Sequence, residues 1–184
     1  MNRKIKNHNF RKYYLLEDYL FNEVRYNFNK RGYLTAEEFF CIIIWKSNRN
    51  KSKIKNKLTN IGKEKNLKTL DTIIKKVTSE IFIQKRKEDK LKILLDTWKF
   101  RLPIASAILT VLYPEEFTVY DDRVLNEIIL KDFVGRKKQI TKYFNDYIPK
   151  VIIEGEGDTL RDKDKYLWGR SFYRDLVKFI ERVD

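Results

Sequence analysis

Two adjacent carboxylates, Asp121 and Asp122, are the residues of this chain whose type and position best suit catalysis. They follow an apolar segment over residues 103–112, a turn, and a short extended run that ends at Tyr120. A carboxylate held at a helix start can stabilise positive charge on a sugar and can orient or deprotonate water. Asp is also a favoured N-cap, contributing about 1 kcal/mol there. Capping is therefore the alternative role for Asp121, and the two roles are compatible.

The composition indicates a globular protein with an excess of positive charge. The chain has 184 residues, of which 42% are hydrophobic, and carries 40 Lys and Arg against 26 Asp and Glu, a formal charge of +14. Such an excess favours contact with a polyanion such as nucleic acid. The chain is also rich in Lys, Asn and Ile together, and an AT-rich genome would produce the same bias. We expect a single domain over residues 1–184, which includes a basic N-terminal arm over residues 1–9.

Several kinds of chemistry are excluded by what the chain lacks. Cys41 is the only cysteine and lies in an apolar run, so we expect a buried, inert thiol. His8 is the only histidine and lies in the basic arm, which argues against a His-assisted nucleophile and a multi-His metal centre. We expect no metal and no cofactor. No apolar run reaches about 18 residues, and no signal-peptide pattern follows the start, so a soluble cytoplasmic protein is expected.

Apolar residues recur mostly at intervals of three and four, and only 6 Gly and 3 Pro interrupt them. Helices are predicted over residues 10–28, 36–46, 67–81, 91–98, 103–112, 124–129, 140–152 and 166–180. Thr35 and Glu38 form a capping-box pattern, which favours a helix over a buried strand at residues 41–45. Residues 47–65 are strongly basic and are predicted to form a surface loop or a short helix. The sum is an all-α fold of about eight or nine helices.

One region resembles a known family. Lys99 and Arg101 precede a helix that begins at Pro103, and helix N-termini bind phosphate. The run Asp121-Asp122-Arg123-Val124 follows at the family's spacing, so this region resembles the helix-hairpin-helix DNA glycosylase superfamily. The resemblance implies a two-lobed helical bundle with a central hairpin and a cleft between lobes. It also implies a monomer that binds double-stranded DNA with one base flipped out, and Asp121 as the catalytic carboxylate.

The chain departs from the family at two points. Bifunctional members carry a nucleophilic lysine where this chain has Pro103, 18 residues before Asp121. The resemblance therefore implies base removal without lyase activity. The hairpin usually contains glycines, whereas residues 98–102 contain none. Residues 32–35, 45–49 and 160–168 resemble blocks of small bacterial proteins related to the same superfamily.

The candidate site residues follow from charge and from this resemblance. Nucleic-acid contacts are expected from Lys46, Lys99, Arg101, Ser106 and Arg123. Candidate base-pocket residues are Trp45 and Trp168, because a flipped base stacks on aromatic rings. Two other functions stay open: a non-catalytic helical module that binds nucleic acid by charge, and a protein-interaction domain whose charge only keeps it soluble.

Overall fold

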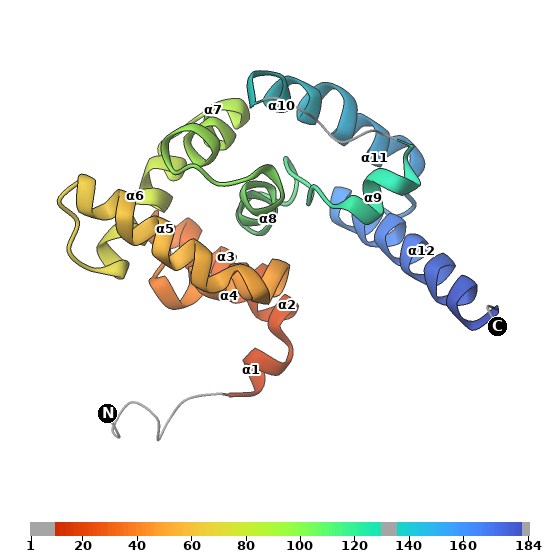
Figure 1. The fold of residues 1–184 in the computed structure, drawn as a ribbon, viewed down its shortest axis with the longest axis horizontal. Coiled ribbons are helices and arrows are strands. Elements are labelled where there is room, and N and C mark those ends of the chain that lie inside the picture. The colour runs from red at the N-terminus through yellow and green to blue at the C-terminus, as the bar shows by residue number, and fades with distance from the viewer. Residues whose placement is uncertain (1–9, 130–135, 182–184) are drawn as a thin grey trace. The chain divides into compact units, whose positions relative to one another are not determined.

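A computed structural model of the protein describes residues 10–129 and 136–181 and confirms the all-α prediction. These residues contain helices and no β-strand (Figure 1). When helical segments that follow one another without a gap are counted as one helix, the described part of the chain has nine helices. The chain divides into two compact units, Met1–Ile83 and Gln84–Asp184, and each unit is described by itself. The basic arm over residues 1–9 lies outside the described residues.

The first unit consists of a helical stretch over residues 11–31 with a break at residue 15, a second over residues 36–64, and a final helix over residues 70–82. Its elements are α1 Arg11–Tyr14, α2 Leu16–Asp18, η1 Tyr19–Val24, α3 Arg25–Arg31, α4 Ala36–Ser47, η2 Asn48–Asn50, α5 Lys51–Glu64 and α6 Leu70–Phe82. The predicted helix over residues 10–28 is therefore real, although it is interrupted at Leu15 and contains the π-helical η1. It ends at Gly32, whose φ of 76° is the left-handed conformation that glycine adopts without strain.

The start of α4 is fixed as its sequence predicts. The Thr35 hydroxyl accepts the Glu38 amide, and the Glu38 carboxylate accepts the Thr35 amide at 2.9 Å. Glu38 is buried, and Arg31 and Asn27 also donate to its carboxylate. These donors compensate the cost of burying the charge. The capped helix also settles residues 41–45 as helical, with a buried face formed by residues 39, 41, 42 and 43.

Of the two alternatives predicted for residues 47–65, the helix is present and the loop is not, although α5, with 14 residues, is longer than the short helix expected. Only Ile54, Leu58 and Gly62 are buried along it, spaced four residues apart. This spacing is sufficient for one face to pack against α6. Because this buried stripe is narrow and many lysines surround it, the sequence has the composition of a solvent-exposed segment.

The second unit surrounds one apolar helix. Its elements are α7 Lys87–Lys92, η3 Ile93–Thr97, α8 Leu102–Leu112, α9 Asp122–Glu127, α10 Arg136–Lys142, η4 Tyr143–Tyr147, α11 Ile148–Glu154 and α12 Leu160–Glu181. Every residue of α8 except Pro103 is buried, and Pro103 occupies the first turn, where its missing amide hydrogen costs nothing. Figure 1 shows α9 lying against α12, which is its main neighbour.

The long helix α12 packs over only part of its length. Its buried residues are Asp164, Leu167 and Ser171. The helix predicted over residues 166–180 lies within α12, but its apolar residues Phe172, Leu176 and Ile180 are exposed. No helix within residues 10–129 and 136–181 has the length and apolarity needed to cross a bilayer.

Two helical glycines give opposite predictions for substitution by alanine. A Cβ at Gly62 would lie 2.3 Å from Cδ1 and 2.6 Å from Cγ1 of the buried Ile73. We expect Gly62→Ala to lower the free energy of unfolding by about 1 to 3 kcal/mol through overpacking. A Cβ at Gly169 meets nothing within 4 Å, so Gly169→Ala should raise the free energy of unfolding by about 0.5 to 1 kcal/mol. Urea denaturation of both variants checks this, and a Gly62→Ala variant as stable as wild type or more stable would contradict the packing described for α5 and α6.

Candidate functional site

Asp121 is the N-cap of α9. Its backbone is extended, with φ −137° and ψ 139°, and its Oδ1 accepts the amide of Arg123 at 3.0 Å. The carboxylate is partly exposed, so it is held in place while it still borders solvent. Asp122 lies in the first turn of α9 and is exposed. The capping role expected as the alternative for Asp121 is therefore present, and Asp122 is a surface residue.

Two tyrosine hydroxyls hold the chain immediately before α9. The Tyr143 hydroxyl accepts the amide of Thr118 at 3.1 Å and donates to the carbonyl of the same residue. The Tyr147 hydroxyl donates to the carbonyl of Val119 at 2.6 Å and accepts the amide of Asp121 at 3.3 Å. This chain segment is buried without regular secondary structure, so these hydroxyls satisfy backbone groups that water cannot reach.

Ser106 fixes the same segment from the other side. Its side chain is completely buried in α8, and its hydroxyl accepts the amide of Tyr120 at 2.9 Å while donating to the carbonyl of Pro103 at 3.3 Å. The structure thus assigns Ser106 an internal positioning role in place of the expected contact with DNA. What approaches this small residue closely is the protein's own backbone.

Tyr143 and Tyr147, which the sequence placed only in a predicted helix over residues 140–152, are the residues that hold this segment. Their rings stack at 5.8 Å between centroids with an interplanar angle of 18°, and both are completely buried. Burial raises the pKa of both hydroxyls, so each stays protonated at neutral pH and can donate its hydrogen bond. The available signal was a pair of tyrosines four residues apart on an apolar stripe, since a buried tyrosine hydroxyl requires a polar partner.

Helix α9 is clamped to α12 by ion pairs. Glu127 is buried, and its carboxylate accepts from Arg170 at 2.7 Å and also pairs with Arg174. Near the start of α9, Arg123 pairs with Asp175 at 2.6 Å. These contacts fix both ends of a helix of six residues, which is too short to be stable by itself.

Arg123 also lies beside two aromatic rings of α12. Trp168 and Phe172 stack at 5.6 Å with an interplanar angle of 7°, and the guanidinium of Arg123 lies 5.5 Å from each ring centroid. Trp168 is 43% exposed, so it is available for contact and is not part of the core. The structure therefore brings Arg123 and Trp168 together, next to the helix that Asp121 caps.

The turn before α8 presents cations more readily than amides. Lys99 adopts a left-handed backbone with φ 57°, and Arg101 is the N-cap of α8 without a side-chain cap hydrogen bond. The amide of Phe100 donates to the carbonyl of Leu94 at 2.9 Å, and Pro103 has no amide hydrogen. Lys99 and Arg101 are both exposed, so this glycine-free turn presents two cationic side chains to solvent.

Trp45 and Lys46 belong to the first unit, at the end of α4. Both are half-buried, and the Trp45 ring packs edge-on against Phe21 at 5.7 Å. Asp121, Lys99, Arg101, Arg123 and Trp168 all belong to the second unit. Most of the predicted site residues therefore share the second unit, whereas Trp45 and Lys46 belong to the first.

The described residues offer little for metal-dependent or thiol chemistry. Within them, no group of three His, Cys, Asp or Glu side chains could hold a metal ion. Cys41 is buried, and burial raises its thiol pKa to about 11, which agrees with the expected inert thiol. The chain matches no protein-family model, no curated protein and no solved structure.

The hydroxyl bonds before α9 make Tyr143→Phe a test of how the site is held. The variant keeps the ring but leaves the amide and carbonyl of Thr118 buried without their partner. We expect it to lower the free energy of unfolding by about 1 to 3 kcal/mol. Tyr173→Phe, at an exposed position of α12, should change it by less than about 0.5 kcal/mol.

Tyr143→Phe should also change how the stability of the protein depends on pH. A hydroxyl whose pKa is raised by folding contributes stability that is complete below the ordinary pKa of 10.0 and is lost as the pH rises above it. Wild type should therefore lose stability between about pH 9 and pH 11, and Tyr143→Phe should lose less over that range. Equal losses in both proteins would contradict the buried, neutral state of Tyr143.

Proposed function

We propose that this protein is a monofunctional DNA glycosylase that hydrolyses the N-glycosidic bond of a damaged or modified base, with Asp121 as the catalytic carboxylate. The observation that carries the proposal is the placement of Asp121. It caps α9 with a partly exposed carboxylate, at the end of a segment that Ser106, Tyr143 and Tyr147 immobilise.

The chemistry requires one fixed negative charge beside a sugar. As the bond from C1′ to the base breaks, its electron pair leaves with the base and positive charge develops on the sugar ring. A carboxylate nearby stabilises this oxocarbenium ion and can accept a proton from the water that then bonds to C1′. The proton then passes to the departed base, which leaves the carboxylate ionised again. Because Asp121 is already fixed by the cap and by the segment before it, little reorganisation is needed when the charge appears.

Proposed contacts to DNA come from three cations in the second unit. Lys99 and Arg101 are exposed at the start of α8 and would contact the phosphate backbone. Arg123 lies beside the stacked rings of Trp168 and Phe172. An exposed ring suits stacking with a base that has left the duplex. Trp45 and Lys46 of the first unit stay as proposed contacts to the base and to the backbone.

Pro103 supports hydrolysis as the end point. A Schiff-base lyase needs an amine nucleophile, and the position that the family resemblance assigns to that amine is a proline at the first turn of α8. The proposed product is therefore an abasic site in an uncut strand.

Asp121→Asn separates the catalytic role from the capping role. Asparagine caps helices about as well as aspartate, so the variant should keep its melting temperature and its affinity for DNA. It should release base at least about 100-fold more slowly than wild type, because the fixed charge is lost. The measurement is single-turnover base release from duplexes that each carry one modified base, with abasic sites revealed by heating in alkali.

Asp122→Asn is the matched control, because it removes the same charge from the neighbouring exposed residue. It should keep the wild-type rate. Base release by Asp121→Asn as fast as by Asp122→Asn and by wild type would contradict the mechanism. Strand breaks that appear without alkali would contradict the absence of lyase activity.

A specific observation favours a second candidate, a non-catalytic module that binds nucleic acid. The turn before α8 contains no glycine, and the amide of Phe100 is used inside the protein. Binding would then rest on Lys99 and Arg101. This candidate predicts strongly salt-dependent binding with no base released from any duplex.

A further inference from the structure

We infer that the first unit carries a nucleic-acid-binding surface of its own, the lysine face of α5 together with the turn into α6. We call it the α5 lysine face, and its residues are Lys51, Lys53, Lys55, Lys57, Lys63 and Lys68. The inference extends the proposed action on DNA, but it depends on neither Asp121 nor catalysis.

The charge on α5 is concentrated on its outward surface. The helix carries five lysines and one acidic residue, Glu64, and all five lysines are exposed. The buried residues Ile54, Leu58 and Gly62 form a narrow stripe, and Lys53, Lys57 and Lys63 lie on the side of the helix away from it. Residues four apart on a helix are separated by about 6 Å along its axis, so Lys53 and Lys57 rise along this outer side as a row of cations. A row of this kind can follow the phosphates of a nucleic-acid strand.

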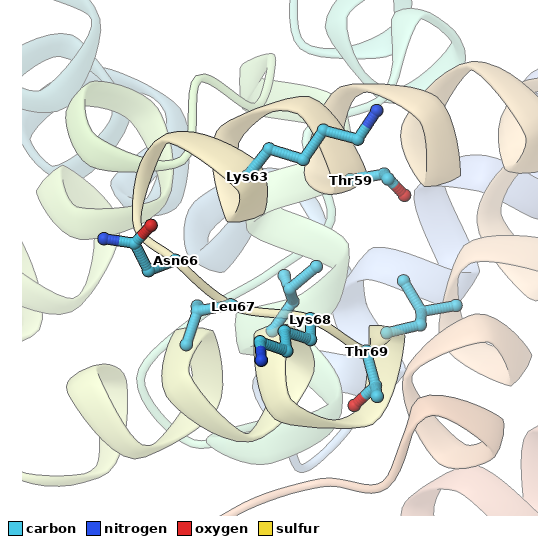
Figure 2. Close-up of a pocket in the computed structure, with 8 residues that line it drawn as sticks. Thr59, Lys63, Asn66, Leu67, Lys68 and Thr69 are labelled. Carbon is cyan, nitrogen blue, oxygen red and sulfur yellow. The ribbon is translucent and has the colours of Figure 1, made fainter.

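The row continues into a hollow where α5 meets α6 (Figure 2). The hollow has a volume of about 360 Å³ and is lined by Thr59, Lys63, Asn66, Leu67, Lys68, Thr69, Leu70 and Ile73. Figure 2 shows Lys63 extending from α5 and Lys68 from the connection that leads into α6. That connection turns back at Asn66, whose φ is 58°. Two lysines from different segments thereby border one concave surface.

The charged donors of this hollow are the two ammonium groups, and the side-chain amide of Asn66 lines it beside them. The Thr59 hydroxyl donates to the carbonyl of Lys55 at 3.0 Å, and the Thr69 hydroxyl is engaged with Thr72 in the cap of α6. Lysine acts as a mobile point charge and does not require one fixed geometry. The surface therefore suits the repeated phosphates of a nucleic-acid backbone, read without regard to base sequence.

The exposed residues of α5 favour nucleic acid over a membrane. A helix that lies on a membrane inserts an exposed apolar face between lipid head groups. The apolar side chains of α5 are buried or half-buried within the first unit, and every exposed position is Lys, Ser, Asn or Glu. The surface thus has the charge for a polyanion and lacks the apolar face that lipid insertion needs.

The test is the salt dependence of DNA binding. A triple variant, Lys53→Gln, Lys55→Gln and Lys63→Gln, removes three charges and keeps good helix formers. The probe is an unmodified, fluorescently labelled duplex, and anisotropy gives its affinity at several salt concentrations. The variant should bind at least about tenfold more weakly at moderate salt. The slope of log affinity against log salt should shrink by about 0.9 for each phosphate that the variant no longer neutralises.

The control removes three exposed lysines from the second unit: Lys85→Gln, Lys92→Gln and Lys178→Gln. It should keep nearly the wild-type slope, and circular dichroism should show both variants folded. Equal decreases of affinity and slope in the two triple variants would overturn the inference, because they would reflect net charge alone. Binding of wild type to phosphatidylserine vesicles that is abolished in the α5 variant, with no change in DNA binding, would also overturn it.

The outcome is distinguishable from failure of the proposed function. Asp121→Asn should keep the full salt slope while losing base release. The α5 variant should release base at the wild-type rate once enough protein is added to saturate the duplex. A wild-type protein that binds through the α5 lysine face and releases no base would refute the glycosylase alone.

Discussion

The second unit depends on one constraint: a buried chain segment without regular structure must find hydrogen-bond partners for its backbone. The segment that leads to Asp121 is buried from Thr118 to Tyr120. Its amides and carbonyls cannot reach water, and no neighbouring strand pairs with them in the described structure. The hydroxyls of Ser106, Tyr143 and Tyr147 fill this need from two sides. The direction in which the chain enters α9, and hence the position of the Asp121 carboxylate, follows from these bonds.

The position of Asp121 depends equally on α12. Helix α9 has only six residues, and the buried Glu127 binds it to Arg170 and Arg174. Removing one partner of a buried ion pair leaves the other charge uncompensated and is strongly destabilising. A site with a single carboxylate is therefore supported by a shell of hydroxyls on one side and an ion-pair clamp on the other, which is what a preorganised charge requires.

Local signals in the sequence predicted the helix boundaries well. Thr35, Gly32 and Pro103 act through their own backbone geometry, so their roles are visible in short motifs. The features that the sequence did not predict depend on tertiary packing. Three small or apolar residues among lysines left a loop and a short helix equally open for α5, and nothing in the apolar spacing of α12 showed that its end is exposed. The same contrast holds for the candidate site. Asp121 could be predicted from its position in the sequence, whereas the roles of the tyrosine hydroxyls that hold it depend on the folded structure.

The proposed role of the Asp121 carboxylate, stabilising positive charge on a sugar, can be tested without knowing the base. Two duplexes would be compared, one with a cationic pyrrolidine in place of a sugar and one with a neutral tetrahydrofuran. Mimics of a transition state bind more tightly than neutral ground-state analogues, by roughly 100-fold or more. We predict that wild type prefers the cationic duplex over the neutral one and that Asp121→Asn loses this preference while binding the neutral duplex as before. Equal preference in both proteins would contradict this role of Asp121.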